Sequence, residues 1–188
     1  MDFSDLSQIG RCTMRIDPLQ AWLIEYLRRG MQTVYIETTI PSYLAANPSS
    51  REPVASHQKI SRAWWDEDRH RFLLYTSAFV RQEAAGGDPE AAKRRMGYLD
   101  SLPDLDVPDE LDTLEADLIR LFQLPPQAAT DASHLGMAIL HRMDYLLTWN
   151  CTHLANAILL KDLHEYCAYH RLHFPLVCTP ETLITPRP

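Results

Sequence analysis

Residues 34–40 read Val-Tyr-Ile-Glu-Thr-Thr-Ile, a short apolar run that ends at an acidic residue and continues into two threonines. This run predicts a short buried strand over Val34–Ile36, with Glu37 at its carboxyl end. Comparable runs recur along the chain, and Leu105–Val107 is the weakest of them. The others are Phe72–Tyr75, Tyr145–Thr148 and Leu176–Cys178. The sequence therefore predicts a sheet of four to five short strands.

Amphipathic helices are predicted between these strands. Apolar residues recur at helical spacing from Asp109 to Phe122, and Ser77 and Asp88 are placed to cap the helices that follow them. Further helices are expected over residues 54–69, 131–142 and 156–172, and a broken Pro- and Ser-rich segment is expected before residue 54. Short apolar strands that alternate with such helices imply right-handed crossovers and a parallel sheet covered on both faces. We therefore predict a three-layer α/β domain over residues 31–188.

Residues 1–30 are predicted to form an N-terminal extension with an amphipathic helix over residues 17–30. Asp17 suits an N-cap, Pro18 suits the first helical position, and Gly30 suits the C-terminal stop. One apolar stripe consists of Leu19, Trp22, Leu23, Tyr26 and Leu27. Either the protein starts at Met31, or this helix is a real addition. The capping residues and the stripe favour a real addition.

The 188-residue chain carries a net charge of −7, the wrong sign for a protein that binds nucleic acid through bulk charge. The N-terminus carries Asp2 and Asp5 and no basic leader, and no run reaches the ~18 apolar residues of a membrane helix. The scattered cysteines are expected to be buried thiols rather than disulfides or zinc ligands. They are Cys12, Cys151, Cys167 and Cys178. We therefore expect a cytoplasmic protein without a membrane segment.

Acidic and amide side chains follow the predicted strands closely. Glu37 comes directly after the first strand, and Asn150 comes just after the strand that ends at Thr148. Glu83 lies in the helix that leaves the second strand, and Asp131 opens the helix before Tyr145–Thr148. In open α/β sheets ligands bind beyond the carboxyl ends of the strands, so these groups are expected to converge there. Converging carboxylates repel one another unless divalent cations neutralise them, which predicts a Mg²⁺ or Mn²⁺ site suited to phosphate chemistry.

Four segments, in this order, resemble the motifs of PIN-domain nucleases. Val34–Ile40 resembles the first motif, a strand that ends in an acidic residue followed by hydroxyl residues. Ser77–Glu83 resembles the second, and Asp131–Ala138 is similar to the third, an Asp-Ala-x-His-x-x-x-Ala helix start. Leu146–Asn150 resembles the fourth, in which a strand ends in Thr-x-Asp or Thr-x-Asn. The resemblance covers about residues 33–184.

The resemblance implies a metal-dependent endoribonuclease, and more narrowly the toxin of a VapC-type toxin–antitoxin pair. By motif position, Glu37, Glu83 and Asp131 would bind the metal and its attacking water. Asn150 would support the second position, and Thr39, Thr148 and His134 are candidates for supporting roles. RNA would be the substrate, a small antitoxin protein the inhibitor, and a homodimer the assembly.

Two departures from the pattern bear on the metal site. The first acidic residue is Glu37 rather than the commoner Asp, so its carboxylate reaches one methylene further. The fourth position is Asn150, which offers a carbonyl oxygen but no charge. A site with three carboxylates instead of four is expected to hold a second metal ion more loosely.

Simpler roles compete for the same residues. Glu37 and Glu83 can be solvated charges, and Asp131 can complement the positive end of its helix. Asn150 can cap the turn over residues 151–155, and His134 fits a hydrogen-bonded core histidine better than a catalytic base. The alternative functions are a non-catalytic PIN-like module that binds RNA or protein, and a DNA nuclease that uses the same site.

The substrate-binding residues are not identified by the sequence. Basic residues gather between residues 51 and 71 and at Lys93-Arg94-Arg95, but helix surfaces carry such charges routinely. Trp64-Trp65 is a candidate for base stacking, and a buried pair or a dimer contact is the preferred alternative.

Overall fold

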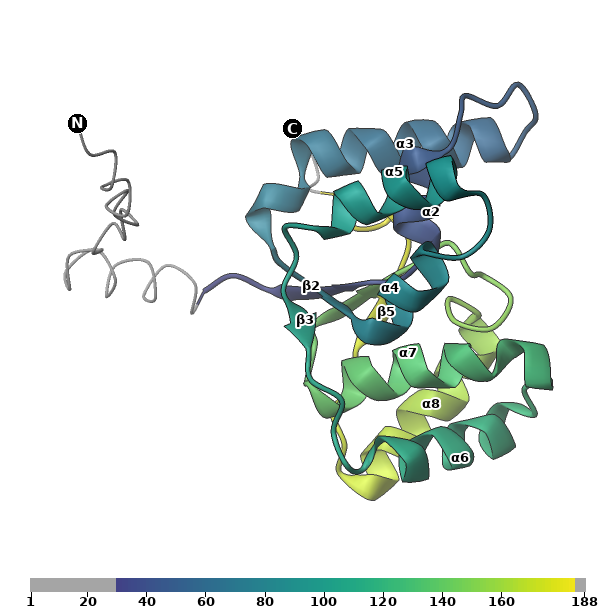
Figure 1. Ribbon diagram of the computed structural model, residues 1–188. Helices are drawn as coiled ribbons and strands as arrows, with labels where there is room; N and C mark the ends of the chain where they lie inside the picture. The colour runs from purple at the N-terminus through teal and green to yellow at the C-terminus, as the bar shows by residue number, and fades with distance from the viewer. Residues whose placement is uncertain (1–29, 185–188) are drawn as a thin grey trace, which may run out of the picture. The chain divides into compact units, whose positions relative to one another are not determined.

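A parallel sheet of five strands, in the order β3-β2-β1-β4-β5, forms the centre of the fold (Figure 1). The computed structural model describes residues 30–184, so apart from Gly30 the helix expected over residues 17–30 lies outside the described residues. The strands are β1 Thr33–Ile36, β2 Leu73–Ser77, β3 Asp104–Leu105, β4 Tyr145–Leu147 and β5 Leu176–Cys178. All pair in parallel, which confirms the predicted sheet.

Helices cover both faces of this sheet and complete the predicted three-layer α/β arrangement. One layer contains α2 Thr39–Ala45, α3 Val54–Glu67 and α5 Pro89–Leu99, and the opposite layer contains α6 Leu111–Phe122, α7 Ala129–Leu140 and α8 Ala157–His170 (Figure 1). Helix α4, Ala78–Ala84, leaves β2 directly at its carboxyl end. The 3₁₀ turns η1 Arg69–Arg71 and η2 Pro126–Ala128 complete the elements.

The strand order reverses its direction between β1 and β4. The chain builds β1, β2 and β3 toward one edge, then returns to place β4 and β5 on the other side of β1. Such a reversal leaves a crevice beyond the carboxyl ends of the two strands, where α/β proteins bind ligands. Glu37 follows β1 and Thr148 follows β4, so both lie at this reversal point.

Local sequence explains why several helices begin where they do. The Ser77 side chain accepts a hydrogen bond from Val80 N, and Asp88 accepts one from Ala91 N at 2.8 Å. Asn156 caps α8 through Ile158 N at 3.0 Å. These side chains satisfy backbone donors that the first turn of a helix leaves free, as predicted for Ser77 and Asp88.

The predicted apolar face of α6 packs against α7. Leu111, Leu114, Leu118 and Phe122 are buried, whereas Leu121 is only partly so. Gly136 of α7 allows the close approach, because a Cβ at that position would lie 2.5 Å from Leu111 Cδ1. The packing holds α7, which carries Asp131 and His134, in a fixed position.

The structure corrects several predicted boundaries. Helix α2 occupies the start of the segment expected to be broken, because Pro41 lies in the first turn, where its missing N–H is not needed. Strand β3 covers Asp104–Leu105 rather than Leu105–Val107, and α7 begins at Ala129, so Asp131 lies inside the first turn.

The cysteines agree only in part with the expectation of buried thiols. Cys167 is buried, as expected, and burial raises its pKa to about 11. Cys151 is exposed, contrary to the expectation of a buried thiol.

Within residues 30–184, no helix combines the length and hydropathy needed to cross a membrane.

Candidate metal centre

Glu37 is held at the carboxyl end of β1 by a cage of hydroxyl and amide donors. The strand pairing continues up to this residue, because Glu37 N donates to Leu147 O at 3.1 Å. Its Oε2 accepts hydrogen bonds from Thr39 N at 3.0 Å, Thr39 Oγ1 at 2.5 Å and Thr148 Oγ1 at 2.7 Å. Its Oε1 accepts none from any residue that the structure describes. The side chain is therefore fixed through one oxygen and open at the other.

Glu83 projects from α4 and is fixed in the same manner. Its Oε2 accepts hydrogen bonds from Thr38 Oγ1 and from His134 Nε2, the latter at 3.1 Å, and its Oε1 has no partner within the described chain. Burial works to raise the pKa of Glu83, but the hydrogen bonds from His134 and Thr38 outweigh burial and leave the pKa below its ordinary value. Glu83 is therefore an anion at neutral pH.

A buried hydrogen-bonded chain lies behind Glu83. His134 is fully buried, and its Nδ1 lies 3.0 Å from the Tyr35 hydroxyl, which in turn lies 2.7 Å from Ser77 Oγ. Burial raises the pKa of Tyr35 far above its ordinary value, so the phenol keeps its proton. Because the Glu83 carboxylate can only accept, Nε2 of His134 is the donor to it, and in a neutral ring Nδ1 then accepts from the Tyr35 hydroxyl. His134 is thus a hydrogen-bonded core histidine that orients Glu83.

Glu37, Glu83 and His134 form a group that is able to hold a metal ion, with one ligand atom from each within 4.8 Å of the others. Both nitrogens of His134 already have hydrogen-bond partners, whereas each carboxylate keeps one oxygen without a partner among the described residues, so the carboxylates are the groups able to accept an ion. Carboxylate oxygens suit Mg²⁺ and Mn²⁺, which also keep several waters. The donor set therefore fits the predicted class of ion.

Asp131 lies outside that group and belongs to a second one. Its Oδ1 accepts a hydrogen bond from Asn150 Nδ2 at 2.9 Å, and its Oδ2 lies 2.9 Å from His153 Nδ1. Asn150 Oδ1 in turn accepts from His153 N at 3.1 Å, so Asn150 also caps the turn that follows it. The structure thus joins Asp131 and Asn150 directly and brings in His153, which sequence reasoning missed.

Thr39 and Thr148 connect the strand ends that carry the two groups. Beyond their bonds to Glu37, Thr39 Oγ1 accepts from Trp149 N at 2.8 Å, and Thr148 Oγ1 accepts from Asn150 N at 2.8 Å. Both threonines therefore fix the loop after β4 relative to the loop after β1.

Several of the residues considered for RNA contact have structural roles. Trp64 and Trp65 are 1% and 6% exposed, so they form the buried pair rather than a stacking surface. Arg94 Nε donates to Ala45 O at the end of α2, and Arg95 Nε donates to Ala84 O at the end of α4. These guanidinium groups satisfy carbonyls that helix ends leave free.

No family model matches the chain, and no curated protein matches it. Among solved structures it is similar to a chain of VapBC2 from Rickettsia felis, solved bound to a DNA fragment from their promoter. The sequence identity is 12%, the alignment covers 79% of this chain and 98% of that chain, and the TM-score is 0.44. The likeness is a distant one, and the relation to PIN-domain nucleases stays a resemblance of motifs.

Proposed function

We propose that the chain is a divalent-metal-dependent endoribonuclease that hydrolyses RNA phosphodiester bonds and serves as the toxin of a toxin–antitoxin pair. The convergence of Glu37 and Glu83 at the reversal point of the sheet carries this proposal. Each carboxylate is fixed through Oε2, and each keeps Oε1 without a hydrogen-bond partner among the described residues. The four motifs that resemble PIN-domain nucleases support the same activity.

In this proposal Glu37 and Glu83 hold Mg²⁺ or Mn²⁺, and Asp131 completes the set. A bound ion supplies a Lewis acid for the phosphate and lowers the pKa of a water. Thr39 and Thr148 keep Glu37 in position, and His134 keeps Glu83 ionised and aimed. Cleavage by water leaves a 5′-phosphate and a 3′-hydroxyl, as the resemblance implies.

A small antitoxin and a homodimeric assembly belong to the same proposal and rest on the motifs, and a cytoplasmic location is proposed from the sequence composition. Light scattering of the purified chain tests the dimer. Copurification with the product of a neighbouring short reading frame tests the antitoxin.

The activity is tested by incubating the purified full chain with single-stranded RNA in Mn²⁺, in Mg²⁺ and in EDTA. We expect endonucleolytic products with either ion and none in EDTA. Wild-type protein that cuts no RNA in Mn²⁺ would contradict the proposal. Competition between RNA and DNA substrates separates a ribonuclease from a DNA nuclease that uses the same residues.

A non-catalytic module that binds RNA or protein is the second candidate. It is favoured by Asp131, whose two oxygens both have protein partners, and by the amide at Asn150. Calorimetric titration discriminates the two candidates. Binding of Mn²⁺ that Glu37→Gln abolishes supports the nuclease, whereas no binding at millimolar Mg²⁺ or Mn²⁺ favours the module.

A further inference from the structure

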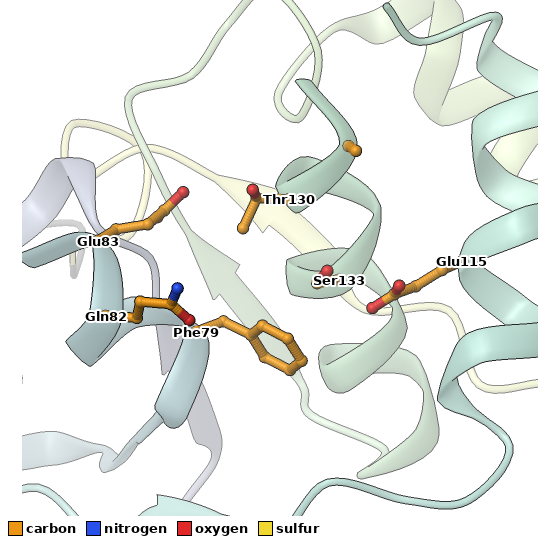
Figure 2. A pocket seen from close by; sticks show the side chains of 7 residues that line it. Phe79, Gln82, Glu83, Glu115, Thr130 and Ser133 are labelled. Carbon is orange, nitrogen blue, oxygen red and sulfur yellow. The ribbon is translucent and has the colours of Figure 1, made fainter. Parts of the chain in front are cut away.

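A hollow of about 420 Å³ opens beside Glu83, between α4, α6 and α7 (Figure 2). Its volume lies within the range of small-molecule sites. The lining residues are Phe79, Gln82, Glu83, Glu115, Ala129, Thr130 and Ser133. Because Glu83 belongs to both the hollow and the metal centre, a group bound here lies next to the proposed cleavage point.

Apart from Glu83, the polar side chains of this hollow have no hydrogen-bond partner within the described residues, unlike those of the metal centre. Gln82, Glu115, Thr130 and Ser133 form no side-chain hydrogen bond with any residue in the described range 30–184. Ser133 is only 6% exposed, so its hydroxyl lines the hollow from a largely buried position. Gln82 is exposed and Glu115 and Thr130 are half-buried, so these side chains are accessible to a polar ligand that enters the hollow.

The charge of the lining selects the kind of ligand. Glu83 and Glu115 are acidic, and no Lys, Arg or His lines the hollow. A phosphate is therefore repelled, whereas a neutral group with N–H donors is attracted. Figure 2 shows Phe79 and Gln82 on the helix that carries Glu83, facing the helix of Thr130 and Ser133, with Glu115 beyond it. The exposed part of the Phe79 ring offers an apolar face for stacking.

From this lining we infer that the hollow binds one nucleobase of the RNA substrate, a base with an exocyclic amino group, beside the scissile phosphate. The inference rests on the proposed ribonuclease function. A carboxylate accepts hydrogen bonds from the exocyclic amino group of cytosine, adenine or guanine, whereas uracil offers it only N3–H, flanked by two carbonyl oxygens that repel it. Single-stranded RNA presents such base edges freely, and an aromatic ring stacks any base. Glu115 is the specificity-determining residue, and Phe79 supplies affinity.

The test is cleavage of an RNA library with randomised sequence in Mn²⁺, with the new 5′ ends mapped by sequencing. We expect uracil to be depleted about tenfold at one position next to the cut in the wild-type profile. Glu115→Gln should relieve that depletion, because an amide both donates and accepts. Phe79→Ala should lower kcat/KM about tenfold for every base. If Phe79→Ala destabilises the fold, Phe79→Leu removes the aromatic ring while it keeps most of the side-chain bulk.

Glu90→Gln is the matched control, since Glu90 is an exposed glutamate of α5 outside the hollow. Calorimetry with Mn²⁺ should give the wild-type affinity for Glu115→Gln, which separates base recognition from metal binding. A wild-type base profile in Glu115→Gln, with RNA still cut, would overturn the inference and leave the proposed function standing. If Glu115→Gln keeps the wild-type base profile but binds a partner protein more weakly, the hollow belongs to a protein partner instead.

A binding measurement distinguishes a failure of this inference from a failure of the proposed ribonuclease function. The four nucleosides are titrated into the full chain while the NMR signals of Phe79 and Ser133 are followed. Shifts with cytidine, adenosine or guanosine that exceed those with uridine support the inference even where cleavage fails. No shift with any nucleoside overturns it whatever the cleavage result.

Discussion

The carboxylates at the carboxyl edge of the sheet fall into two differently built groups. In Glu37 and Glu83, Oε2 takes every hydrogen bond, and Oε1 has none within the described residues. In Asp131, by contrast, Oδ1 bonds to Asn150 and Oδ2 bonds to His153. The first arrangement holds an oxygen ready for a cation. The second uses both oxygens for protein contacts, so a cation binds Asp131 only through lone pairs beside those contacts.

The difference comes from the residues that surround each carboxylate. Thr39 and Thr148 both donate to the same oxygen of Glu37, whereas Asn150 supplies an N–H to Asp131 where an aspartate would repel it. We therefore infer that Glu37 and Glu83 bind the main ion and that Asp131 is the weaker ligand. Each variant below tests that ranking.

Glu37→Gln should have the largest effect, because it removes the charge of the best-fixed carboxylate while keeping its shape. We expect RNA cleavage in Mn²⁺ to fall by more than the ~10–100-fold typical of groups that only support a metal ligand. Calorimetry should show weakened Mn²⁺ binding. The exposed Glu90→Gln serves as the control, and equal rates in both variants would remove Glu37 from the site.

Asp131→Asn should reduce cleavage by about tenfold, less than Glu37→Gln does. The reason is that Asp131 shares its oxygens with Asn150 and His153. Initial rates across a Mn²⁺ series would show part of the loss recovered at high metal concentration. A loss larger than that of Glu37→Gln would reverse the ranking of the two groups, and a wild-type rate would make the proposed mechanism wrong.

His134→Ala should lower activity and shift its pH dependence. The hydrogen bond from His134 helps to keep the pKa of Glu83 low, so its removal raises that pKa. Glu83 then becomes protonated at a higher pH as the solution is acidified, and the acid limb of the pH–rate profile moves to higher pH. Loss of one of the two partners of the buried Tyr35 hydroxyl, with Ser77 remaining, should also cost about 1 kcal/mol of unfolding free energy.

Tyr35→Phe separates the two effects of His134. This variant removes the hydroxyl beside Nδ1 and leaves the contact between Nε2 and Glu83. Its acid limb should move less than that of His134→Ala. An unmoved acid limb in both variants would show that His134 does not act through Glu83.

Asn150→Asp should have the smallest effect on cleavage and a distinct effect on stability. It replaces the N–H donor to Asp131 with a second negative charge, so the apo protein should lose about 1 kcal/mol of unfolding free energy. Mn²⁺ should restore that loss, because the cation neutralises the added carboxylate. Thermal unfolding with and without Mn²⁺ measures this, and a metal-induced shift no larger than that of wild type would place position 150 outside the metal site.

The sequence predicts well where the strands lie, apart from the bounds of β3, because apolar runs such as Leu176–Cys178 have few alternatives in an α/β chain. The placement of Glu37 and Asn150 after strands follows from the same pattern. Helix α2 was not predicted, since Pro41 and the serines near it are typical of loops. His153 gave only the weak signal of lying three residues after Asn150, because pairing with Asp131 depends on how a loop folds over α7. The hydrogen bonds that separate Glu37 from Asp131 depend on side-chain geometry, which spacing alone does not specify.

RNA cleavage by the wild-type chain and by Glu37→Gln in Mn²⁺, with EDTA as the metal-free control, tests the proposed activity most directly. We predict metal-dependent cuts with 5′-phosphate and 3′-hydroxyl ends for the wild type, and more than ~100-fold slower cleavage for Glu37→Gln. Cleavage that persists in EDTA, or equal cleavage by the two proteins, would contradict a metal centre built on Glu37.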